Sequence, residues 1–164
     1  MSFVGIVTES KKEVEIKQLL KNYFDTINQK HTIIVINEKS IQNIKNVKFE
    51  ILLIDAVTLT KPMLLQNIIL NAKMIIVNSD FEVNLKCIKN LKLRVITYGL
   101  NSKSTITVSS VNEETILISL QRSVKTLKDN IIEPQEIKIS SKTTHNNLYI
   151  SMILAIFFII FDKI

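Results

Sequence analysis

The sequence predicts an α/β protein: a mostly parallel sheet flanked by helices, then a small antiparallel sheet and a C-terminal apolar helix. Three observations predict this fold class. In residues 1–100, β-branched apolar runs alternate with amphipathic helical patterns, which implies crossover connections between parallel strands. In 101–140, apolar and polar residues alternate, as in antiparallel strands with one exposed face. The segment 148–161 is apolar almost throughout.

Five predicted strands, with helices between them, occupy the first hundred residues. The strands are short apolar or β-branched runs at 3–7, 32–36, 51–57, 73–77 and 93–97. Between the first two, apolar residues recur at helical spacing from Ile16 to Ile27 on an otherwise charged segment. Pro62 suits a helix start, because an N–H group there would have no intrahelical partner. This alternation predicts a Rossmann-like, mostly parallel sheet.

The segment after the fourth strand predicts a helix that begins with a capping box. Ser79 is placed to accept a hydrogen bond from the first turn, and Glu82 is placed to reach back toward it. Phe81, Leu85 and Ile88 then follow at helical spacing. We expect these three side chains to face the sheet.

Antiparallel strands are predicted in the region 101–140. Ile106 and Val108 alternate with Thr and Ser, and residues 116–120 repeat the alternation. Asn112 lies between the two runs and favours a hairpin turn there.

A third strand is predicted at 131–139, where Pro134 requires an edge position or a bulge. No internal repeat or low-complexity linker separates the parts of the chain. We therefore predict a single domain, 1–164.

Charge and cysteine content argue against several functional classes. The formal charge is +6, yet Arg94 and Arg122 are the only arginines, and the lysines are scattered beside acidic residues. Arg is the residue best suited to grip phosphates, so we predict no nucleic-acid partner. Cys87 is the single cysteine, which excludes an internal disulfide and favours a cytoplasmic location. The N-terminal segment lacks a basic region, so we expect no signal peptide.

The apolar segment 148–161 has two interpretations. As a C-terminal anchor it would associate the protein with a membrane. Its fourteen residues would span about 21 Å as a helix, whereas the hydrocarbon core of a bilayer is about 30 Å thick. Segments of this length are more often buried in protein, so we favour a packed helix over 145–161.

Three segments resemble the central domain of the Mur ligases, which join amino acids to cell-wall precursors through an acyl phosphate made from ATP. Residues 74–80 and 95–101 are similar to a strand ending in Asn-x-Asp and a later strand ending in Thr-Tyr-Gly. Residues 104–110 resemble the first strand of the family's small antiparallel sheet. Residues 145–149 resemble the Asn-Val-Tyr-Asn that opens a buried helix, which supports the packed-helix interpretation.

The phosphate-binding loop of that family has no intact counterpart here. The family has Gly-x-Thr-Gly-Thr-x-Gly-Lys-Thr, and the matching residues are 5–13. Lys12 falls on the lysine position, but Thr8 and Lys11 replace loop glycines, and Glu13 replaces the hydroxyl residue that holds Mg²⁺. A phosphate cradle needs backbone N–H groups without Cβ obstruction. We therefore interpret Lys12 as a solvated helix residue and expect no ATP binding.

The resemblance assigns roles to a few further positions. Asp55, after the third strand, matches a glutamate that binds Mg²⁺, although a lone carboxylate there is more often a cap or a surface charge. Asn147 matches the first asparagine of the buried helix, and Ile150 replaces the second, which helps hold adenine. The vestigial nucleotide-binding candidates are thus Thr8, Lys12 and Asn147. Asp55 is the candidate metal ligand, and no catalytic residue is predicted.

The remaining reactive side chains do not form a recognisable site. Neither His31 nor His145 has Cys, Asp or Glu at metal-ligand spacing. Cys87 is interpreted as a small packing residue rather than a reactive thiol.

Three functional hypotheses follow. The first is a non-catalytic binding or structural module with a Mur-ligase-like fold, an unknown protein partner or small ligand, and no cofactor. Only the resemblance links it to cell-wall (peptidoglycan) metabolism. The second is an ATP-dependent amide ligase component, which would need ATP, Mg²⁺ and a partner chain that supplies the missing parts. The third is a C-terminally anchored membrane protein with a degenerate soluble domain. We favour the first because the phosphate loop is degenerate.

Overall fold

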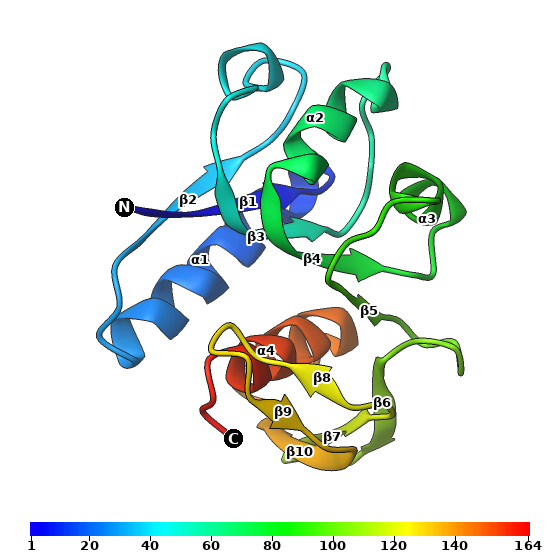
Figure 1. The fold of residues 1–164 in the computed structure, drawn as a ribbon. Coiled ribbons are helices and arrows are strands. Elements are labelled where there is room, and N and C mark those ends of the chain that lie inside the picture. Colours follow the sequence, from blue (N-terminus) through cyan, green and yellow to red (C-terminus); the bar gives the residue numbers. More distant parts are fainter. The chain divides into compact units, whose positions relative to one another are not determined.

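The computed structural model describes residues 1–164 and divides them into two compact units, Met1–Val95 and Ile96–Ile164 (Figure 1). The division falls at the start of the strand Val95–Tyr98 (β5). The sequence has no linker-like segment there.

The unit Met1–Val95 is built on four parallel strands in the order β4-β3-β1-β2. The strands are β1 (Ser2–Val7), β2 (His31–Val35), β3 (Phe49–Ile54) and β4 (Ala72–Asn78). The helices are α1 (Ser10–Thr26), α2 (Leu65–Leu70) and α3 (Glu82–Ile88), with short 3₁₀ turns at η1 (Ile41–Asn43) and η2 (Pro62–Leu64). The predicted strands and the parallel arrangement are confirmed, and Pro62 opens a helical segment as predicted.

The helices cover both faces of this sheet. Figure 1 shows α1 and α2 on opposite sides of it. The buried cluster on the α2 side combines β3 and β4 residues with Leu65, Ile68 and Ile69 of α2. Gly5 lies in β1 at a crowded point, because a Cβ there would come within 2.8 Å of Leu52 Cδ1 and 3.0 Å of Ile36 Cδ1. This glycine serves core packing rather than a loop.

The prediction for α3 is wrong in two respects. The helix begins after Phe81, so Phe81 and not Ser79 is its N-cap residue. Phe81 and Leu85 are 43% and 36% exposed. The inner face is instead formed by Asn84 with Cys87 and Ile88, which lie three and four residues further on. The buried Asn84 sets the rotation of the helix through its hydrogen bonds to backbone carbonyl oxygens.

The unit Ile96–Ile164 contains a mixed sheet. Its strands follow the order β5-β6-β7-β10, in which β6 (Ile106–Val111) is parallel to β5, and β7 (Thr115–Leu120) and β10 (Gln135–Ser140) are antiparallel to their neighbours. The β6–β7 hairpin is confirmed: the Asn112 side chain accepts hydrogen bonds from the backbone N–H groups of Glu114 and Thr115, at 3.0 and 2.8 Å.

Pro134 divides the strand predicted at 131–139. The part before it is β9 (Ile131–Ile132), which pairs with β8 (Val124–Lys125) in a separate two-stranded sheet. The part after it is β10, which pairs with β7. A proline has no N–H group to donate to a ladder, so the chain changes sheets at this residue.

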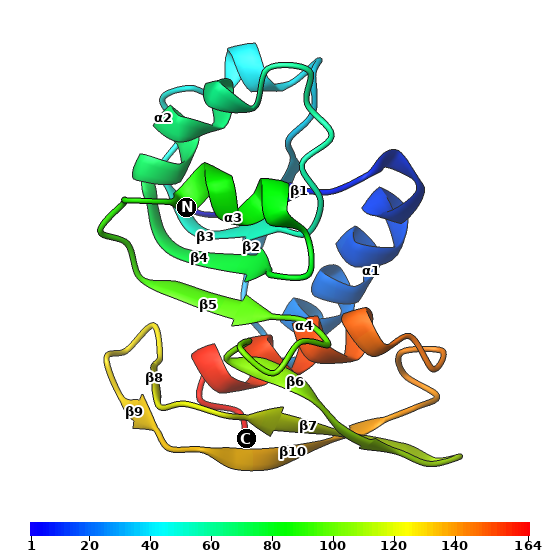
Figure 2. The same ribbon diagram turned by 90° about the vertical axis from the view of Figure 1, so that its right-hand side faces the viewer.

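The apolar segment near the C-terminus forms α4 (Leu148–Ile160), which lies against β6, β7 and β10 (Figure 2). Nearly all of its side chains are buried. Its one strongly polar inner residue, Ser151, donates to the Asn147 carbonyl oxygen at 2.7 Å and is 2.7 Å from the Thr144 hydroxyl. None of the helices combines the length and apolar character needed to cross a bilayer.

Candidate functional site

The carboxyl ends of β1, β3 and β4 meet at one edge of the first unit's sheet. Because these strands are parallel neighbours, the residues that end or follow them come together. Thr8 follows β1, Asp55 follows β3, and Asn78 ends β4. All three are at least nine-tenths buried. The two candidates Thr8 and Asp55 are therefore neighbours.

Asp55 is the centre of this edge. Its Oδ2 accepts a hydrogen bond from Thr8 Oγ1 at 2.8 Å, and its Oδ1 accepts one from Asn78 Nδ2 at 3.3 Å. Lys12 Nζ, from the first turn of α1, lies 3.6 Å from Asp55 Oδ2 and 3.6 Å from Glu9 Oε1. The carboxylate is 1% exposed, so these partners compensate a charge that water does not reach.

Two interpretations from the sequence need correction here. Lys12 was expected to be a solvated helix residue, but its side chain is only 30% exposed and pairs with a buried carboxylate. Asp55 is neither a cap nor a surface charge. The sequence places both residues correctly after their strands, but it does not show that the lysine side chain turns inward to meet the acid.

Asn84, which the hydrophobic pattern of the sequence did not single out, joins the segments at this edge. Its Nδ2 donates to the carbonyl oxygens of Asp55 at 2.8 Å and Asn78 at 2.9 Å, while its Oδ1 accepts from Val57 N at 3.0 Å. One fully buried amide thus satisfies backbone groups of two loops. The signal was available in the sequence: an amide at the position that shares a helix face with Cys87 and Ile88 is expected to have a buried partner.

The turn between β1 and α1 consists of Thr8 and Glu9 alone. Glu9 is extended, with φ −70° and ψ 148°, and no residue from Ser2 to Ile27 has a positive φ. A phosphate-binding nest needs successive backbone N–H groups that converge through alternating backbone conformations. Beside this turn, the backbone N–H groups of Asp55 and Ala56 both donate to the Val7 carbonyl oxygen, at 2.8 and 3.2 Å.

The donor set does not suit a divalent cation. Mg²⁺ needs several oxygen ligands in an octahedral arrangement, but the Asp55 oxygens already accept from Thr8 and Asn78, and Lys12 places a positive charge beside them. No cluster of three or more His, Cys, Asp or Glu side chains in the chain could hold a metal ion.

Asn147 lies in the other unit, where it is the N-cap of α4. Its Oδ1 accepts from the backbone N–H groups of Tyr149 at 3.1 Å and Ile150 at 3.2 Å. Ile150 is 3% exposed. A helix-capping role accounts for the asparagine at this position without a nucleotide.

A second polar cluster lies at the opposite, amino-terminal edge of the first sheet. His31 Nδ1 is 2.9 Å from Ser2 Oγ and 3.6 Å from Glu50 Oε2, and the Ser2 hydroxyl donates to Glu50. Burial lowers the pKa of His31, and the Glu50 carboxylate opposes this shift. Burial also raises the pKa of the Cys87 thiol, which is consistent with a packing role for this cysteine.

No family model and no curated protein matches the chain. The Mur-ligase resemblance therefore stays a prediction from the sequence.

Proposed function

We propose that the chain is a non-catalytic binding or structural module with a Mur-ligase-like fold. The observation that carries this proposal is the network in which Lys12, Thr8 and Asn78 bind the Asp55 carboxylate. The lysine and carboxylate that a ligase would direct at ATP and Mg²⁺ are directed at each other. A link to cell-wall metabolism rests on the sequence resemblance alone.

The free-energy cost of breaking the Lys12–Asp55 pair disfavours triphosphate binding, which a ligase would require. To bind a triphosphate, Lys12 would have to leave Asp55, which would then keep a buried charge with fewer partners. Removing one member of a buried ion pair costs about 3–5 kcal/mol. Glu9 would add a negative charge next to the phosphates, and the two-residue turn offers no cradle of N–H groups to compensate.

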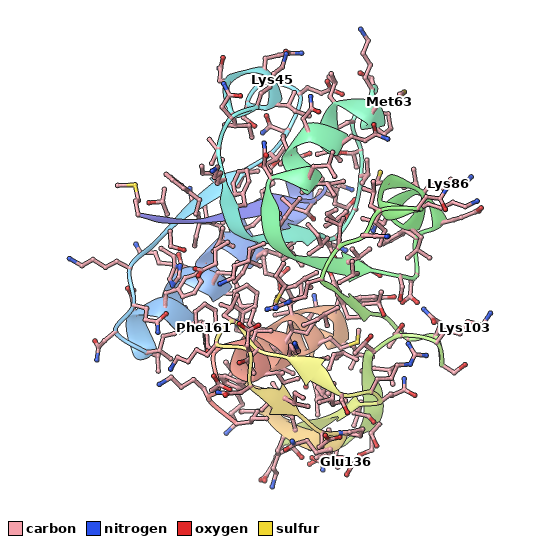
Figure 3. All side chains as sticks on the ribbon, in the orientation of Figure 1. Lys45, Met63, Lys86, Lys103, Glu136 and Phe161 are labelled. Carbon is pink, nitrogen blue, oxygen red and sulfur yellow. The ribbon has the colours of Figure 1, made fainter.

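A binding role is supported by the surface beside this edge. Phe81, Val83 and Leu85 are exposed by 43%, 41% and 36% on or next to the short helix α3. The same helix carries an exposed ion pair between Lys86 and Glu82, and the labelled Lys86 side chain projects away from the ribbon (Figure 3). Phe81 and Leu85 are four residues apart and lie on the same flank of the helix, so they form the apolar surface that we propose for a protein partner.

Calorimetric titration with ATP and Mg²⁺ tests whether the chain binds the nucleotide that a ligase would need. We expect no saturable binding in the micromolar range. Lys12→Met and Lys11→Met form a matched pair, since Lys11 is the exposed neighbour. Micromolar binding that Lys12→Met abolishes and Lys11→Met preserves would show that the loop still holds a nucleotide, and the proposal would be wrong.

A further inference from the structure

A cavity of about 300 Å³ lies between the second half of α1 and the start of β2. The loop after α1 returns the chain alongside that helix, so both segments contribute to the walls (Figure 1). The lining residues are Lys17, Lys21, Phe24, Asp25, Gln29, Lys30, His31 and Ile33. This cavity is separate from the carboxyl edge of the sheet described above.

The walls carry an excess of positive charge. Lys17 and Lys21 are one helical turn apart on α1, and Lys30 lies on the loop before β2. Asp25 is the one acidic residue of the lining. Like charges at i and i+4 repel each other on a helix, so an anion between them would relieve an unfavourable interaction that is already present in the folded chain.

The inner wall is an aromatic pair that fixes a histidine in position. The rings of Phe24 and His31 stack with centroids 4.2 Å apart and an interplanar angle of 28°. His31 Nε2 is 3.1 Å from Gln29 Oε1, and Nδ1 faces Ser2 and Glu50. With acceptors on both ring edges, the protonated imidazole can donate from both nitrogens, so a positive charge on His31 is accommodated next to the cavity.

We propose that this cavity is a binding site for a small dianion of the phosphate-monoester class, held by Lys17, Lys21 and Lys30 beside His31. Three ammonium groups against one carboxylate leave two positive charges for the ligand to neutralise. Lysines bind phosphate as point charges without a fixed planar geometry. The volume is at the lower end of the range for small-molecule sites, which suits a compact ligand.

Binding at this site is coupled to the protonation of His31. The charged groups around the ring are Glu50 on β3, Lys17, Lys21 and Asp25 on α1, and Lys30 on the loop. A bound dianion favours the imidazolium form, so it raises the pKa of His31. The same linkage makes the dianion bind more tightly when His31 is protonated than when it is neutral.

The test uses the histidine ring resonances of the full-length protein, titrated by NMR with inorganic phosphate at constant ionic strength. His145, in the other unit, is the internal reference, because the chain has two histidines. We expect saturable movement of the His31 resonances and an upward shift of its pKa, with His145 unmoved. Acetate, a monoanion, should shift His31 much less at the same ionic strength.

A pair of charge-matched variants locates the site. Lys17→Gln/Lys21→Gln should weaken phosphate binding by about tenfold for each charge-assisted hydrogen bond lost. Lys11→Gln/Lys92→Gln removes the same charge from exposed positions outside the cavity and should leave binding unchanged. The proposal is wrong if phosphate leaves His31 unmoved, moves both histidines alike, acts no more strongly than acetate, or binds the Lys17→Gln/Lys21→Gln variant as tightly as wild type. Because this readout does not involve Lys12, it is independent of the ATP titration.

Discussion

At the scale of single residues, Asp55 is the side chain on which the carboxyl edge of the first sheet depends. It is almost completely buried and accepts from Thr8 and Asn78 while Lys12 pairs with it. Such a residue in an α/β fold invites a catalytic or metal-binding interpretation. Its partners indicate a structural one, because a hydroxyl, an amide and a lysine already occupy both carboxylate oxygens.

Replacing Asp55 tests this structural role. Asp55→Ala should lower the free energy of unfolding by about 2–4 kcal/mol, because it leaves the buried donors of Thr8 and Asn78 without their acceptor, while Lys12 keeps Glu9 as a partner. Asp55→Asn, which keeps the shape and loses the charge, should cost less. Urea unfolding followed by circular dichroism measures both values, with the exposed Glu15→Gln as the control. Wild-type stability in Asp55→Ala would show that the network contributes nothing.

At the scale of secondary-structure elements, each helix end needs partners for its free backbone groups. α4 obtains them from Asn147, whose side chain accepts from two N–H groups of the first turn. The resemblance to a nucleotide-binding asparagine and the capping geometry therefore lead to different expectations for the same residue.

A substitution at Asn147 separates these expectations. Asn147→Ala should destabilise the protein by about 1 kcal/mol through the lost cap, and Asn147→Asp should restore most of that stability, because aspartate caps helices equally well. Thermal unfolding of the three proteins measures the effect. Equal stability of the alanine and aspartate variants would contradict the capping role.

The elements also show what could be predicted from the sequence. The parallel strands followed from their β-branched runs, and the hairpin at Asn112 followed from alternation and turn chemistry. The failure at α3 has a physical cause: hydrophobic spacing predicted Phe81 and Leu85 inside, whereas the buried hydrogen bonds of Asn84 rotate the helix otherwise. Residues brought together across loops, such as Lys12 and Asp55, were beyond any local pattern because their contact depends on tertiary structure.

At the scale of the whole molecule, the free energy of unfolding should decrease at acidic pH because of the buried imidazole of His31. Burial lowers the pKa of His31 from its usual value of 6.5, so between 6.5 and the lowered value the unfolded chain binds more protons than the folded one. Stability is therefore complete above pH 6.5 and falls as the pH drops through that window.

Urea unfolding at a series of pH values in a phosphate-free buffer measures this loss. His31→Asn should flatten the decline below pH 6.5, whereas His145→Asn, at an exposed position with a positive φ that asparagine tolerates, should follow the wild-type curve. An unchanged curve in His31→Asn would assign the decline to other groups.

The three hydrogen bonds of Asn84 have a further consequence for recognition. They join the segment after β3 to the turn after β4 through a single side chain, so neither segment can rearrange alone. Many α/β proteins close a flexible loop over what they bind and lose entropy in doing so. A partner that docks here would instead meet a preorganised surface, and its association should proceed without a slow conformational step.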